Sequence, residues 1–275
     1  ASYVILGEEI AIVETGPTST VGNLLNGLKK IGVKFKDVNF VAVSHIHLDH
    51  GGGAGTLMHH LPNAKLIVHP RGALHLVNPE KLWAQSQQVL GQVAELYGEP
   101  EPVSAERIIQ AADGMSVSLG KSIELEILET LGHASHHFSY YEKGSKILFP
   151  GDAAGIYLNQ FDVIVPTTPP PFHLETTLSS IEKLVQKKPD LLCYTHFGVA
   201  TNAIEKLQRH AVQLKLWAAI VIEGLKKGET IETISETIRQ GDPAVRAISV
   251  FVKTHPIVGR GVARQNVQGF VEYFL

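Results

Sequence analysis

The sequence predicts a mixed α+β protein in which residues 1–200 combine strands and helices and residues 201–275 are mostly helical. Three observations support this fold class. Short apolar runs of β type recur before residue 200, stretches with helical spacing separate them, and only helical patterns follow. With 275 residues, of which 44% are hydrophobic and 19% charged, the chain can bury a large core. We therefore expect a main domain at 1–200 and a helical extension, 201–275, that packs on it.

The predicted strands are short apolar runs bounded by Gly, Pro, Asp or Asn. They are YVIL (3–6), IAIV (10–13), FVAV (40–43), KLIV (65–68), IELEIL (123–128), KILF (146–149) and DLLCY (190–194). IELEIL alternates apolar and charged residues, which predicts a strand with one buried face.

Helical patterns lie between these strands. Asn78 and Pro79 supply a cap and a first-turn proline, and apolar residues then follow helical spacing as far as Gly98. This pattern predicts a helical insertion at about 71–111. A further helix is expected over 176–188.

The region after residue 200 has its own start and stop signals. Asn202 and Glu205 predict a capping box, and a long apolar stripe follows until Gly228. A shorter helix should end at Gly241, and Asp242 with Pro243 should open the next one.

Composition excludes several classes of protein. The net charge of -3 argues against nucleic acid or an anionic membrane surface as a partner. The longest apolar runs are far shorter than the roughly 20 residues of a membrane span, and no basic region precedes an apolar run at the start, so no secretory signal is expected. The single cysteine, Cys193, cannot form a disulfide within the chain. We expect a soluble cytoplasmic protein.

The segment VSHIHLDHGGG (43–53) places three histidines and an aspartate directly after a predicted strand. Loops at strand ends are where catalytic groups concentrate. His45 and His47 can converge on one ion, whereas Asp49 and His50, expected in a first helical turn, can reach another point. Imidazole and carboxylate groups are ligands of zinc, iron and manganese, and no cysteine lies nearby. The three glycines that follow allow close backbone approach. The segment predicts a metal site.

Three other candidate ligands also follow predicted strands. His133 comes after IELEIL in LETLGHASHH, Asp152 after KILF in a Gly-Asp turn, and His196 after DLLCY. One site along the edge of a sheet requires such a recurrence.

The ordered set HxHxDH, Gly-His, Gly-Asp and His-x-Gly resembles the metallo-β-lactamase superfamily over residues 1 to about 200. The resemblance implies an αββα four-layer sandwich with C-terminal helices and two divalent metal ions, zinc first, with iron or manganese as alternatives. It assigns His45, His47 and His133 to one metal, Asp49, His50 and His196 to the other, and Asp152 to both.

Two features depart from the family pattern. Glu14-Thr15-Gly16 stands where the family has an acidic Asp-x-Gly turn, so Glu14 is a candidate support for the site. In GHASHH the ligand should be His133, with His137 in a non-ligating position and His136 exposed.

The same resemblance narrows the chemistry to a dinuclear hydrolase that attacks a lactone, carboxylic ester or thioester with a bridging hydroxide. Asp49 and Asp152 are the expected catalytic carboxylates. β-Lactamases of the superfamily carry Cys or Ser at the position of Asp152, its nucleases act on polyanions, and its flavodiiron members have HxExD, which His47 contradicts. The basic glutathione-binding residues of glyoxalase II are not recognisable here. Two alternatives stay open: a mononuclear iron dioxygenase of the persulfide type that uses His45, His133 and Asp152, and a phosphotriester or phosphodiester hydrolase.

Substrate contacts are predicted near the metal-bearing segments. Tyr157 is expected to donate a hydrogen bond to the substrate. Four further residues in or beside the proline-rich stretch PTTPPPFH (166–173) and the His196 loop are expected to line an apolar acyl pocket: Phe161, Phe172, His173 and Phe197. The expected partner is a small acyl compound, and a homodimer is left open.

Overall fold

The structure, a computed structural model, describes residues 1–120, 122–255 and 263–275. They form two compact units. The first contains Ala1–Glu129 and His136–Gly151, and the second contains Thr130–Ser135 and Asp152–Leu275. The predicted boundary at residue 200 stays a prediction.

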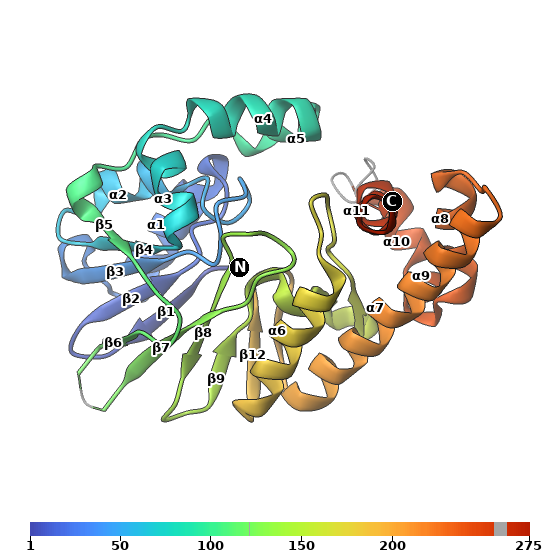
Figure 1. Cartoon of the computed structure of the whole chain (residues 1–275). Helices are drawn as coiled ribbons and strands as arrows, with labels where there is room; N and C mark the ends of the chain where they lie inside the picture. The colour runs from blue at the N-terminus through green and yellow to red at the C-terminus, as the bar shows by residue number, and fades with distance from the viewer. Residues whose placement is uncertain (121, 256–262) are drawn as a thin grey trace. The chain divides into compact units, whose positions relative to one another are not determined.

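The first unit contains a five-stranded sheet with the order β1-β2-β3-β4-β5 (Figure 1). Its strands are β1 (Tyr3–Leu6), β2 (Ile10–Val13), β3 (Val38–Ala42), β4 (Lys65–Val68) and β5 (Ile108–Gln110). β1 and β2 are antiparallel, whereas β2 to β5 run parallel. The carboxyl ends of β3 and β4 therefore lie at one edge of the sheet, which is the edge that carries the histidine-rich loop.

Helices cover this sheet and form the core of the first unit with it. They are α1 (Val21–Lys30), α2 (Ala54–His60), α3 (Pro70–Val77), α4 (Glu80–Leu90) and α5 (Gln92–Tyr97). Val41, Leu57 and Leu66 are fully buried between the sheet and the helices. Burial of each such side chain stabilises the folded state by roughly 1.5–3 kcal/mol. The loop after β3 therefore begins from a well-packed strand.

The first unit also contains antiparallel strands β6 (Ser116–Ser118), β7 (Glu124–Glu129), β8 (Phe138–Glu142) and β9 (Ile147–Phe149). β7 was expected to bury one face only, but Leu125 to Leu128 are all buried, including Glu126. The prediction of a single buried face is wrong, because residues on both faces of the strand are buried. The sequence also did not reveal β8, whose polar residues are buried throughout.

The second unit combines two hairpins with the predicted C-terminal helices (Figure 1). The hairpins pair β10 (Ile156–Leu158) with β11 (Val163–Val165), and β12 (Leu191–Tyr194) with β13 (Gly198–Ala200). The helices are α6 (Leu174–Gln186), α7 (Ala203–Lys226), α8 (Ile231–Gly241), α9 (Pro243–Ala247), α10 (Ser249–Thr254) and α11 (Ala263–Phe274).

Helix ends follow the sequence signals in part. Asp242 caps α9, since its carboxylate accepts a hydrogen bond from the backbone N–H of Ala244. The capping box at Asn202 and Glu205 is wrong, because Asn202 adopts a left-handed conformation (φ 56°) and its side chain makes no capping bond. Across the described parts of the chain, no helix combines the length and apolar character of a membrane span.

Candidate metal centre

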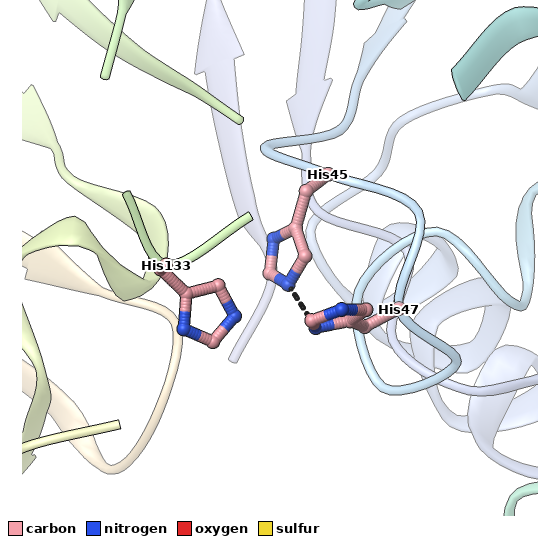
Figure 2. Close-up of side chains that lie close together, drawn as sticks. All are labelled: His45, His47 and His133. Carbon is pink, nitrogen blue, oxygen red and sulfur yellow. Dashed lines mark hydrogen bonds between the residues drawn. The ribbon is translucent and has the colours of Figure 1, made fainter. Parts of the chain in front are cut away.

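The loop after β3 gathers the histidines of the first unit. His45 is fully buried, and its Nε2 lies 2.8 Å from Nδ1 of His47 (Figure 2). Ser44 Oγ holds the other side of the His45 ring, 2.9 Å from Nδ1. The loop therefore orients two imidazoles whose ring nitrogens lie together, as candidate ligands of one metal ion would.

Asp49 and His50 form the second part of this loop. Asp49 Oδ2 lies 3.8 Å from His50 Nε2. The expected helical turn is wrong, because α2 begins only at Ala54 and these residues occupy a tight turn in which the backbone N–H of His50 donates to the His47 carbonyl. The turn still presents the carboxylate and imidazole side by side.

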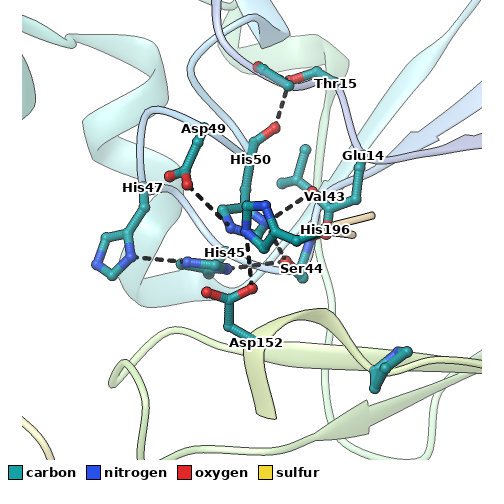
Figure 3. Close-up of polar contacts among 12 residues, drawn as sticks. Glu14, Thr15, Val43, Ser44, His45, His47, Asp49, His50, Asp152 and His196 are labelled. Carbon is teal, nitrogen blue, oxygen red and sulfur yellow. Dashed lines mark hydrogen bonds and ion pairs between the residues drawn. The ribbon is translucent and has the colours of Figure 1, made fainter. Parts of the chain in front are cut away.

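Glu14 supports this loop from the end of β2. The side chain is 2% exposed and the backbone is left-handed (φ 71°). Oε1 accepts a hydrogen bond from the Ser44 backbone N–H at 3.2 Å, and Oε2 faces His50 Nδ1 at 3.5 Å (Figure 3). A carboxylate at Nδ1 favours the tautomer whose Nε2 lone pair is available to a metal.

The glycines allow the loop to fold back on itself. A Cβ atom at Gly52 would lie 2.3 Å from the carbonyl oxygen of Leu48, a separation that no side chain tolerates. We expect the tight turn that carries Asp49 and His50 to require glycine at this position.

Two more histidines lie beside His45. The His137 ring is fully buried, with its centroid 5.0 Å from that of His45. His136 was expected to be exposed, but it is half-buried and stacks at 6.1 Å from His45. Both rings pack against the loop.

The second unit brings together the remaining three candidate ligands. His133 Nε2 lies 3.7 Å from Asp152 Oδ2, and His196 Nε2 lies 3.4 Å from Asp152 Oδ1. Each carboxylate oxygen therefore faces a different imidazole. Zinc bonds of about 2.0–2.1 Å in tetrahedral geometry would place neighbouring ligand atoms about 3.3 Å apart, so these spacings fit shared ions.

Thr167 orients two of these ligands and was missed in the sequence. His133 Nδ1 lies 2.8 Å from the Thr167 carbonyl oxygen, which can only accept, so Nδ1 carries the proton and Nε2 has a free lone pair. Thr167 Oγ1 donates to Asp152 Oδ2 at 3.2 Å. The only sequence signal was the position of PTTPPPFH between two ligand-bearing segments.

The donor chemistry of both clusters fits divalent metal ions. The ligand atoms of His45 and His50, and those of Asp49 and His50, lie within 4.8 Å of one another. Buried imidazoles and carboxylates without a thiolate suit zinc, iron and manganese. The clusters are therefore candidate metal-binding sites.

Tyr157 is buried and contacts two charged side chains. Its hydroxyl donates to Asp162 Oδ1 at 3.0 Å, and the Lys206 ammonium lies 4.7 Å from the ring centroid. Burial and the bond to Asp162 raise the pKa of Tyr157, whereas the bond from Lys206 lowers the pKa of Asp162. The phenol stays neutral and can donate.

The four predicted pocket residues separate into two groups. Phe161 and Phe197 are half-exposed, and both rings contact Phe251 in α10, with centroids 5.9 and 6.1 Å away. Phe172 is buried against Phe270 of α11. His173 directly precedes α6 and packs on Tyr273. The structure thus groups Phe161 with Phe197 near His196, and places Phe172 in the interior of the second unit.

His210 is a buried histidine that lies in no recognisable sequence motif. Burial lowers its pKa from 6.5 to about 4. Because the folded value lies below the unfolded one, its contribution to stability is complete above pH 6.5 and is lost as the pH falls toward 4. Without metal, the native protein should lose roughly 3 kcal/mol more unfolding free energy from pH 7 to pH 4 than His210→Gln. Urea unfolding at both pH values measures this, and equal losses would contradict the prediction.

A mixed α/β fold whose strand ends carry clustered histidines and aspartates defines a candidate metalloprotein. The family described as "Metallo-beta-lactamase superfamily" matches residues 1–196, and the chain belongs to this superfamily. Its members are generally metal-dependent hydrolases. The predicted superfamily and fold class are confirmed.

Similar proteins come from archaea and bacteria. The metallo-beta-lactamase fold-containing protein ST1585 of Sulfurisphaera tokodaii is 26% identical over 218 residues, 77% of each chain, and its crystal structure gives a TM-score of 0.66. The probable metallo-hydrolase MJ0888 of Methanocaldococcus jannaschii is 27% identical over 156 residues, 57% of this chain and 68% of the other. The metallo-beta-lactamase family protein TTHA1429 of Thermus thermophilus shares the fold, with a TM-score of 0.72 at 20% identity over 99% of this chain and 87% of the other.

Proposed function

We propose that this protein is a dinuclear metal-dependent hydrolase that acts on a small acyl compound: a lactone, carboxylic ester or thioester. The observation that carries the proposal is the Asp152 carboxylate, which presents one oxygen to His133 and the other to His196. A carboxylate that bridges two ions must present one oxygen to each of them. Its negative charge also offsets the repulsion between the two cations.

The proposed ligand sets divide the residues between two ions. His45, His47 and His133 hold the first, Asp49, His50 and His196 hold the second, and Asp152 serves both. Two divalent ions, when bound, would lower the pKa of a metal-bound water molecule and would polarise the acyl carbonyl. The tautomers set by Glu14 at His50 and by Thr167 at His133 keep the ligating nitrogens free of protons.

We propose that the substrate side combines a neutral donor with an apolar rim. Because its pKa is raised, Tyr157 keeps its proton at neutral pH. Its hydroxyl can therefore donate a hydrogen bond to the acyl or leaving oxygen once it has given up its bond to Asp162. Phe197 follows the candidate ligand His196 directly and exposes 39% of its surface. This favours a substrate with an apolar acyl part.

Shortening Phe197 to alanine should weaken binding of long acyl chains more than of short ones. The lost aromatic surface is expected to raise KM for a long-chain lactone or ester roughly 10-fold, with kcat little changed. KM values measured for a short and a long acyl substrate test this. Val199→Ala, an exposed change on the same hairpin, is the control. An equal effect on both substrates would contradict an apolar rim at Phe197.

Two measurements test the proposed function itself. Protein loaded with zinc, iron or manganese is assayed against lactones, esters, thioesters and phosphotriesters, and its metal content is measured. Two metals per chain with acyl hydrolysis is the expected result. One iron per chain with oxygen consumption on a persulfide would overturn it in favour of the dioxygenase, and phosphotriester turnover alone would favour the other alternative.

A further inference from the structure

The segment Pro166–Thr168 is held from one side by helix α11. The Asn266 side chain makes two hydrogen bonds to its backbone: Nδ2 donates to the Pro166 carbonyl at 2.9 Å, and Oδ1 accepts from the Thr168 N–H at 2.8 Å. The Thr168 hydroxyl donates to the Asn266 carbonyl at 2.8 Å. Asn266 and Thr168 are 3% and 1% exposed, so water does not replace these bonds.

Gly269, one turn further along α11, brings the helix into direct contact with this segment. A Cβ atom at Gly269 would lie 1.9 Å from the Thr168 carbonyl oxygen and 3.1 Å from Cβ of Phe172. The contact surface of α11 therefore matches the backbone of the segment both in hydrogen bonding and in shape.

Thr167 lies between the two residues that Asn266 holds. As described above, its carbonyl accepts from His133 and its hydroxyl donates to Asp152. Fixing the backbone on both sides of Thr167 fixes the direction of both bonds. A helix about 100 residues away in sequence thereby reaches two candidate metal ligands through one intermediate residue.

We infer that Asn266 is a positioning residue of the metal centre, which it orders through Thr167. The inference rests on the proposed function, because it takes His133 and Asp152 as ligands. Outer partners of metal ligands commonly contribute 10- to 100-fold to metal affinity. Without the Asn266 side chain the Pro166 carbonyl and the Thr168 N–H lose these two hydrogen bonds, so the backbone on both sides of Thr167 is held less firmly.

The test is a Zn²⁺ and Co²⁺ titration of purified variants, with the cobalt absorption spectrum as a readout of ligand geometry. Asn266→Ala should bind zinc about 10- to 100-fold more weakly and change the cobalt spectrum. Asn266→Asp keeps the acceptor for Thr168 but places a carboxylate oxygen against the Pro166 carbonyl, so it should also lose affinity. Thr167→Val, which keeps the carbonyl and removes only the bond to Asp152, should change the spectrum while preserving the fold.

Two variants of α11 separate positioning from packing. Gln268→Ala removes only surface contacts with Glu272 and Arg264 and should leave affinity and spectrum unchanged. Phe270→Leu disturbs the buried packing of the same helix against Phe172 and Trp217, so it should lower thermal stability but keep the cobalt spectrum.

The inference is overturned if Asn266→Ala binds zinc with native affinity and gives the native cobalt spectrum, whatever the behaviour of Thr167→Val. Equal losses of affinity in Asn266→Ala and Phe270→Leu would also overturn it, since packing alone would then explain the effect. Native protein that binds neither metal would instead refute the proposed function, which the inference requires.

Discussion

Replacing Asp152 by alanine is expected to abolish hydrolysis of small lactones and esters while leaving the fold intact. The carboxylate faces both His133 and His196, so its loss removes a ligand from each proposed ion. It also removes the negative charge that offsets the repulsion between the two cations. Even an outer partner of a ligand is worth about 10- to 100-fold, and a shared ligand should exceed that range. The measurements are turnover, metal content and circular dichroism.

Asp190→Ala is the matched control, because it removes an exposed carboxylate just before β12. This variant should keep full activity and metal content. If Asp152→Ala retained native turnover with two metals bound, Asp152 would not be a ligand of both ions.

Removing the metals with a chelator should both stop hydrolysis and lower the thermal stability. Ions that bind only the folded chain stabilise it by about 4 kcal/mol at a concentration 1,000 times the dissociation constant. For a protein of this size that corresponds to a fall in Tm of about 10 °C. Calorimetry before and after dialysis measures the shift, and zinc should restore both properties.

The Asp152→Ala variant provides the control for this experiment. Its Tm should respond much less to the chelator, because its ions are already weakly held. A chelated native protein that kept its activity and Tm would exclude a metal-dependent reaction at these residues.

The positions of the candidate ligands at strand ends could be predicted because each depends on a local pattern. An apolar run followed by Gly, His or Asp predicts a loop at a sheet edge, and HxHxDH places four donors within six residues. The structure groups His45 with His47 and His133 with Asp152, each within its own unit. The assignment to two ions came from the resemblance and is still a proposal.

Glu14 was expected to support the site, but the supporting residues Thr167 and Asn266 could not be predicted, because their roles depend on contacts between distant segments. Asn266 and Pro166 are 100 residues apart, and an asparagine in a helix usually indicates an exposed position. Lys206 and His210 lie on the buried face of α7, where a stripe of apolar residues was the expected pattern. Lys206 is buried there because Asp162 accepts a hydrogen bond from its ammonium group.

The buried face of α7 bears on how far the chain can be shortened. This helix has 24 residues and is about 36 Å long. Near its start Lys206 donates a hydrogen bond to Asp162, and further along Trp217 donates one to Asp242. The family match ends at residue 196, but a protein cut there would lack the ammonium group beside Tyr157. We expect such a fragment to be unsuitable as a minimal enzyme for engineering or crystallisation, however complete its set of histidines.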